Sequence, residues 1–97
     1  MKNENLMSRN AIDAAVDDVL RTLDSGIDYT LYCINGGGFK DEFETDYTLE
    51  GCGTRYQGLI KELQSNGCKV KAEYRTSFDS EFNKEYLTKV LVISLAN

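Results

Sequence analysis

Residues 8–25 carry apolar side chains at the three- and four-residue spacing of an amphipathic helix. That spacing gathers the apolar positions on one stripe, which a globular protein buries against its core. The residues of this stripe are Ile12, Ala15, Val16, Val19, Leu20 and Leu23. We expect Asn10 to cap the helix, with Asp13 reaching back to it, and Gly26 to end it.

Residues 54–66 repeat this pattern and predict a second helix. Its apolar face would hold Tyr56, Leu59, Ile60 and Leu63. Thr54 and Gln57 stand at the positions of a capping pair, and Gly67 follows the last turn, where glycine commonly ends a helix.

Period-two alternation and strand-forming residues predict the sheet. Residues 68–76 alternate apolar and charged side chains, which is typical of a strand with one face in water. Residues 28–35 are apolar on both faces, which indicates a deeper position in the sheet. Residues 86–95 form the most strand-prone segment and the best candidate for a central strand.

The segment between the first predicted strand and the second helix is acidic and aromatic. We expect Asn35 and the three glycines at 36–38 to form a hairpin turn, because glycine tolerates the positive φ of short hairpin loops. Residues 39–49 then alternate apolar and charged side chains like a strand. Their aromatic residues are also spaced four apart, so a short helix remains the alternative there.

The pattern F-x-x-E-F-x-x-acid-Y occurs twice, at residues 39–47 and 78–86. It marks either two versions of one helix-plus-hairpin unit or a coincidence in a short match. The order of predicted elements, α-β-β-α-β-β, favours an α+β fold with an antiparallel sheet of about four strands and two helices packed on one face. We expect residues 1–97 to form a single compact domain, with residues 1–7 as a loosely ordered N-terminal extension.

The net charge of −5 is concentrated in the middle of the chain. Residues 28–51 hold six acidic residues and one lysine, whereas residues 52–97 have a small basic excess. A chain with this balance lacks the basic footprint that binds phosphate backbones, so direct binding of nucleic acid is disfavoured. An acidic surface would instead attract a basic partner.

Three cysteines and no histidine limit the chemistry of the chain. Cys33, Cys52 and Cys68 lack C-x-x-C spacing, and without histidine they do not complete a zinc site. We interpret them as reduced thiols of a cytoplasmic protein, with one disulfide plus one free thiol as the alternative. The chain shows neither a signal peptide's hydrophobic region nor a membrane span.

The sequence contains no recognisable catalytic or cofactor-binding motif. Without histidine the commonest general base is missing, so we expect a non-enzymatic protein without a cofactor. The triple glycine fits neither a P-loop nor a dinucleotide-binding fingerprint, and the acidic segment after it does not match an EF-hand loop. We predict no metal site, with a loose magnesium or calcium site from Glu42, Glu44 and Asp46 as the alternative.

If residues 39–49 form a strand, their carboxylates line one of its faces. Alternate residues of a strand are about 6.6 to 6.8 Å apart. Glu42, Glu44 and Asp46 would then match the spacing of every second phosphate along a DNA strand. The first helix adds acidic residues away from its apolar stripe, namely Asp13, Asp17, Asp18 and Asp24. The simpler interpretation is a solvated face that keeps the protein soluble.

In size, acidity and lack of histidine, the whole chain resembles the small acidic inhibitors that bacteriophages encode against host enzymes, including anti-CRISPR proteins and DNA mimics. Composition carries this resemblance, and no motif does. The resemblance implies a protein that occupies a basic nucleic-acid channel of its target in the bacterial host cytosol and blocks it.

Our leading hypothesis is therefore a binding protein that docks on a basic host protein, of the nucleic-acid-binding class, without touching nucleic acid or membrane. Its predicted partner-binding residues are Glu42, Glu44, Asp46, Tyr47, Asp13, Asp17 and Asp24. One alternative is a structural or regulatory module that self-associates through a sheet edge, as a homodimer would. The other is a nucleotide or small-molecule sensor that uses Lys69, Lys71 and Arg75.

Overall fold

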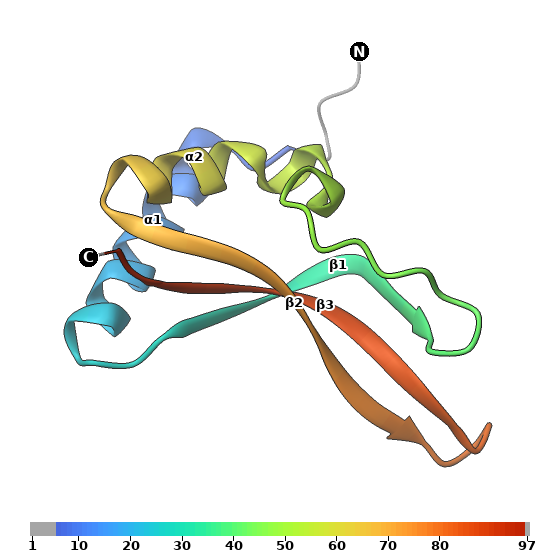
Figure 1. Cartoon of the computed structure of the whole chain (residues 1–97). Helices are drawn as coiled ribbons and strands as arrows, with labels where there is room; N and C mark the ends of the chain where they lie inside the picture. Colours follow the sequence, from blue (N-terminus) through green and yellow to red (C-terminus); the bar gives the residue numbers. More distant parts are fainter. Residues whose placement is uncertain (1–5, 97) are drawn as a thin grey trace.

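The computed structural model describes residues 6–96, except for the side chains of Ile34 and Asn35. Its elements follow the chain in the order α1 (Arg9–Asp24), β1 (Tyr29–Phe39), two 3₁₀ turns η1 (Glu50–Cys52) and η2 (Thr54–Tyr56), α2 (Gln57–Ser65), β2 (Cys68–Asp79) and β3 (Lys84–Leu95). Figure 1 shows a strongly twisted sheet with the two helices at one end and the hairpin between β2 and β3 at the other.

Both helices pack on one face of the antiparallel sheet, which confirms the predicted α+β class. β3 lies between β1 and β2, so the last strand is central, as predicted. Leu91 of β3 is the register partner of Leu31 on β1 and of Ala72 on β2, and these three side chains share one face. The buried apolar residues of both helices pack against this face in one cluster.

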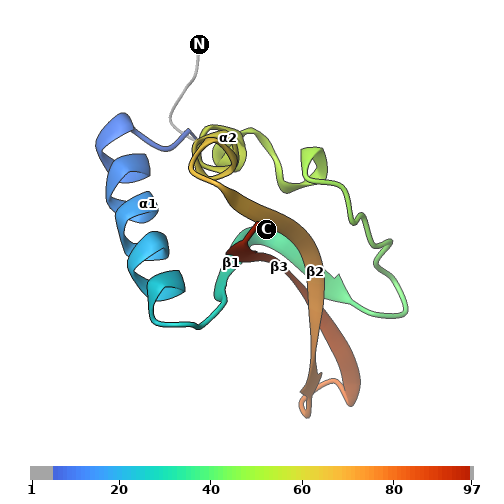
Figure 2. The same cartoon turned by 60° about the vertical axis from the view of Figure 1, so that its left-hand side comes forward.

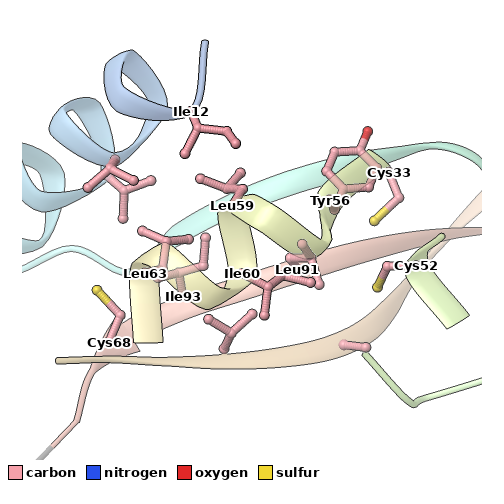
Figure 3. Packing of buried hydrophobic residues seen from close by; sticks show 14 of the residues in the cluster. Ile12, Cys33, Cys52, Tyr56, Leu59, Ile60, Leu63, Cys68, Leu91 and Ile93 are labelled. Atoms are coloured by element: carbon pink, nitrogen blue, oxygen red, sulfur yellow. The ribbon is translucent and has the colours of Figure 1, made fainter. Parts of the chain in front are cut away.

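The core lies between α1, α2 and the covered face of the sheet. Leu63 of α2 and Leu91 and Ile93 of β3 have no solvent exposure, and Val19 of α1 is almost completely buried. Figure 3 shows the α2 side chains lying over those of β3. Burial of this apolar area provides the main driving force for the fold.

Among the described residues the sheet has three strands rather than about four. β1 runs through the glycines at 36–38 to Phe39 and pairs with β3 on both sides of a register shift between Tyr32 and Gly37. Residues 40–49, all of them described, lie in neither a strand nor a helix. The predicted hairpin turn at 35–38 and both predicted structures for 39–49 are therefore wrong.

The glycines of β1 let neighbouring groups approach the backbone closely. A Cβ on Gly38 would lie 2.9 Å from Cδ1 of Phe43, and one on Gly36 would lie 2.9 Å from Cβ of Lys89. A Cβ on Gly37 would collide with the carbonyl oxygen of Leu87. These glycines thus leave space for packing on a strand, which explains why a turn prediction based on positive φ failed.

The start of α1 differs from the prediction. Ser8 is the N-cap, and its Oγ accepts a hydrogen bond of 3.1 Å from the backbone N–H of Ala11. Asn10 lies within the helix. Met7 is partly buried against the core, so it does not belong to a loose extension, and residues 1–5 of that predicted extension lie outside the described residues.

α2 begins at Gln57 without a side-chain cap. The Gln57 side chain donates to the carbonyl oxygens of Leu49 and Gly53 instead of forming the predicted capping pair with Thr54. The C-terminal ends of α1 and α2 are as predicted. Gly26 and Gly67 directly follow the C-cap residues and have φ values of +87° and +84°.

Candidate functional site

The predicted partner-binding residues lie at two separate places. α1 carries Asp13, Asp17 and Asp24, and the loop that follows β1 carries Glu42 and the other acidic candidates. Figures 1 and 2 show α1 and this loop on opposite sides of the molecule. The two groups therefore do not form one continuous acidic surface.

On α1, two of the three predicted carboxylates have ion pairs within the helix. Asp13 lies 2.7 Å from a guanidinium nitrogen of Arg9, and Asp17 lies 2.6 Å from one of Arg21. Each pair joins residues one turn apart, and all four side chains are exposed. Asp24 is exposed at the end of the helix. The two arginines thus compensate part of the charge of the four aspartates on α1.

Asp46 shapes the loop as well as adding charge to it. Its carboxylate accepts hydrogen bonds from the backbone N–H of Thr48 at 3.0 Å and from the Thr48 hydroxyl at 2.7 Å. These two hydrogen bonds lower the pKa of Asp46. The neighbouring predicted residues Glu44 and Tyr47 are exposed. The row of carboxylates expected from a strand does not form, because this segment is not a strand.

The two copies of the aromatic and acidic pattern meet at the end of the sheet that lies away from the helices. The ring of Phe39 in the first copy contacts the rings of Phe82 and Tyr86 in the second edge-on, with both centroid distances at 5.4 Å. We call residues 39–47 and 78–86 together the tip. The pattern marks a contact between two segments of different structure, since the first copy is a strand end with a loop and the second is a hairpin.

Ion pairs join the same two segments. Lys40 lies 3.2 Å from Glu85, and Lys84 lies 3.2 Å from Glu42 and 3.7 Å from Asp41. All of these side chains are at least one third exposed, so each pair contributes little to stability. Together with the ring contacts they hold the loop beside the hairpin.

The tip carries the entire net charge of the chain. It has two lysines and seven carboxylates, so its formal charge is −5, and the other residues hold nine basic and nine acidic groups. The seven carboxylates are Asp41, Glu42, Glu44, Asp46, Asp79, Glu81 and Glu85. Figure 1 shows that the tip lies farthest from the helices.

Large aromatic side chains of the tip are exposed beside these charges. Phe78 is 62% exposed, Phe82 58% and Tyr47 61%. A shallow groove on the hairpin side is lined by Phe78 and Tyr86 together with Ser and acidic residues. Exposed aromatic groups within a charged rim are typical of surfaces that bind proteins.

A buried lysine holds the loop of the tip on the sheet. Lys89 of β3 is only 2% exposed, and its Nζ donates to the carbonyl oxygens of Asp46 and, at 3.2 Å, of Thr48. The hydroxyl of Tyr74 accepts from the backbone N–H of Asp46 at 3.0 Å, and the Tyr74 ring contacts Tyr47 at a centroid distance of 5.2 Å. Lys89 is not among the residues predicted from the sequence, although it is a lone charge in the apolar run 86–95, which is a signal of a buried and partnered cation.

The basic residues proposed for an anionic ligand lie on the exposed face of β2. Glu73, between them, lies 3.5 Å from Lys71 and 3.0 Å from Arg75. The hydrogen bond from Arg75 is the main cause that lowers the pKa of Glu73. This carboxylate compensates part of the positive charge of Lys69, Lys71 and Arg75, so the sensor hypothesis gains no support.

Within the described part of the chain, no group of three or more histidine, cysteine or acidic side chains is arranged to hold a metal ion. Nor does any helix in residues 6–96 have the length and apolar character needed to cross a membrane. Comparison with known proteins gave no match to a family model, a curated protein or a solved structure.

Proposed function

We propose that this protein is a small non-enzymatic binding protein whose tip docks on a basic surface of another protein. The observation that carries the proposal is that the tip combines the whole net charge of the chain with exposed Phe78, Phe82 and Tyr47. Carboxylates attract a basic partner and accelerate its approach. Aromatic side chains supply the contact area that holds the complex once it has formed.

A nucleic-acid-binding protein is the partner class that this chemistry favours. Such a protein presents a basic surface, which often includes groups that stack on bases. The tip would cover this surface and exclude the nucleic acid. In this form the protein would be an inhibitor, as its resemblance in composition to phage-encoded anti-CRISPR proteins and DNA mimics implies, acting through the tip rather than through a row of carboxylates.

Self-association through the sheet edge formed by β2 is less favoured. β2 is an edge strand of twelve residues that pairs with β3 on one side. Lys69, Lys71 and Arg75 stand along it, and like charges brought together by two copies would repel each other. Charged side chains of this kind are a common protection of edge strands against such pairing.

Two variants with the same change of charge separate the tip from α1. The tip variant carries Glu42→Gln, Glu44→Gln and Glu81→Gln, and the helix variant carries Asp13→Asn, Asp17→Asn and Asp24→Asn. Asp46 and Asp79 stay unchanged, because their carboxylates accept backbone hydrogen bonds within their own turns. Circular dichroism and thermal unfolding confirm that both variants fold before binding is measured.

Basic proteins captured from a bacterial lysate are identified, purified and titrated against each variant at about 50 and about 500 mM NaCl. We expect the tip variant to lose at least about tenfold in affinity at low salt, and the helix variant to stay within about twofold. The partner's nucleic acid should compete with the protein for binding. Equal losses in the two variants, or an affinity that salt does not change, would rule out the tip as the docking surface.

A second pair of variants tests the aromatic part of the tip at constant charge. Phe78→Ser with Phe82→Ser removes two exposed rings, and Leu6→Ser with Ile27→Ser removes two exposed apolar side chains elsewhere. We expect the first pair to speed dissociation of the complex at least about tenfold and the second to leave it unchanged. Unchanged dissociation in both would show that charge alone carries the binding.

A further inference from the structure

Two of the three cysteines lie together in the core. Cys33 stands on β1 and Cys52 ends η1, 19 residues later in the chain. Their side chains are 7% and 8% exposed. The Cys52 side chain is a hydrogen-bond neighbour of the Cys33 thiol. Figure 3 shows both cysteines at one end of the cluster and Cys68 at the opposite end. The fold therefore singles out one of the three possible cysteine pairs.

The surroundings of this pair keep both thiols protonated. Burial is the main cause that raises the pKa of Cys33 to about 12, and the neighbouring Cys52 contributes to this rise. Burial also raises the pKa of Cys52, which the ammonium of Lys89 partly opposes. The Lys89 Nζ would lie 2.9 Å from a Cβ on Gly51, so η1 packs directly on this ammonium. As long as η1 stays packed on the core, the two thiols are thus protected from thiol–disulfide exchange.

We propose that Cys33 and Cys52 form a reversible disulfide when a low-molecular-weight disulfide, such as glutathione disulfide, reaches them. The bond would link β1 to η1 and enclose residues 34–51, which include the loop of the tip. Loop closure of this kind restricts the unfolded chain and stabilises the native position of the enclosed segment. This inference does not depend on the proposed function.

The reaction proceeds by two thiol–disulfide exchanges. Opening of η1 first exposes Cys52, which lies on a short turn next to a loop, whereas Cys33 lies within the sheet. The Cys52 thiolate attacks one sulfur of glutathione disulfide, and the released glutathione thiolate takes up the proton that Cys52 lost. The Cys33 thiolate then attacks the Cys52 sulfur, and a second glutathione leaves with the Cys33 proton. Two protein thiols are oxidised while one glutathione disulfide is reduced to two glutathiones.

Peptide mapping tests the pairing in the unmodified protein, so the test does not depend on a variant that could fail to fold. Trypsin cleavage after lysine and arginine places the three cysteines in different peptides, 22–40, 41–55 and 62–69. After incubation with glutathione disulfide and alkylation of free thiols, we expect peptide 22–40 linked to 41–55 and lighter by two hydrogens. Cys68 should be recovered alkylated. A link to peptide 62–69, glutathione adducts alone, or three alkylated cysteines would overturn the proposal.

A Cys68→Ala variant should form the same cross-link, and a Cys52→Ala variant should form none. The oxidised protein should melt at least about 5 °C above the reduced protein, and dithiothreitol should reverse the change. A lower melting temperature after oxidation would show that the bond distorts the native loop, and this too would contradict the proposal.

Discussion

The ammonium group of Lys89 donates a hydrogen bond to the backbone carbonyl oxygen of Asp46, 43 residues earlier in the chain. Through this bond and a second one to Thr48, a side chain of the central strand binds the backbone of the acidic loop. Lys89 is 2% exposed, and the ring of Tyr74 lies 5.9 Å from its Nζ. A charge so deeply buried is tolerated because carbonyl oxygens and an aromatic face replace its water.

The first prediction concerns Lys89→Met, which keeps most of the side-chain volume and removes the ammonium. The carbonyl oxygens of Asp46 and Thr48 would lose their donor, so we expect the free energy of unfolding to fall by about 2 to 3 kcal/mol. The substitution should accelerate hydrogen exchange more in residues 40–52 than in α1. Urea unfolding and exchange mass spectrometry measure the two effects.

Lys61→Met is the matched control, because Lys61 is exposed on α2. It should change the free energy of unfolding by less than about 0.5 kcal/mol. If Lys89→Met leaves exchange in the loop as slow as in the unmodified protein, the loop is held by other contacts.

The helices and the central strand were predictable because local spacing decides them. Val16, Val19 and Leu23 recur at the period of a helix, and the structure buries all three. Residues 86–95 are the most strand-prone segment, and β3 has the predicted central position. In both segments the information lies within a few consecutive residues. The deeper position predicted for residues 28–35 is wrong, because β1 is an edge strand of the sheet.

The loop was not predictable because distant residues decide its conformation. Alternation in residues 39–49 is typical of a strand, but Phe43 packs on Gly38 and the backbone of Asp46 binds Tyr74 and Lys89. These contacts replace strand pairing. Neither alternation nor composition within the segment indicates them, since the partners lie 28 and 43 residues away.

The candidate site was predictable in part for the same reason. The compensation of α1 follows from the sequence, because Arg9 stands four residues before Asp13 and Arg21 four after Asp17. The ion pair in which Lys84 compensates the charge of Glu42 does not follow from the sequence, because 42 residues separate the two. The repeated aromatic pattern can be read from the sequence, but the contact between its two copies depends on the fold.

The second prediction is that Gly37→Ala destabilises the protein although the residue lies in a strand. A Cβ at this position would collide with the carbonyl oxygen of Leu87, which belongs to the backbone of β3 and cannot move without loss of pairing. We expect a loss of about 1 to 3 kcal/mol in urea unfolding. A change below about 0.5 kcal/mol would mean that β1 relaxes more easily than its pairing indicates.

Gly58→Ala serves as a comparison within a helix. Its Cβ would lie 3.1 Å from the end of the flexible Ile12 side chain, which can shift by a few tenths of an ångström. Alanine favours a helix over glycine by up to about 1 kcal/mol. We therefore expect this variant to be as stable as the unmodified protein or slightly more stable.

The third prediction separates the observed cap of α1 from the one predicted from the sequence. Ser8→Ala removes the acceptor of the hydrogen bond from Ala11, so it should lower the free energy of unfolding by about 1 kcal/mol. Asn10→Ala should have no cost or a small gain, because Asn10 is exposed within the helix and alanine has a higher helix propensity. Thermal unfolding of both variants measures the difference. The reverse order of stabilities would restore Asn10 as the cap.

The fourth prediction concerns stability at alkaline pH. The pKa of Cys33 rises from its ordinary value of 9.0 to about 12 in the folded protein, mainly because burial disfavours the thiolate. Between these values the unfolded chain has lost the thiol proton and the folded chain retains it. The contribution of the buried Cys33 thiol to the free energy of unfolding is therefore fully present below about pH 9, and it is lost as the pH rises toward 12.

Cys33→Ala removes this dependence, although it also removes packing and so destabilises the protein at every pH. The difference in unfolding free energy between the two proteins should stay constant up to about pH 9 and then shrink by as much as about 1.4 kcal/mol per pH unit. Tyrosines and lysines titrate in both proteins, so their effects largely cancel in the difference. Urea unfolding from about pH 8 to about pH 10 covers the onset, and parallel curves over that range would show that Cys33 titrates at its ordinary value.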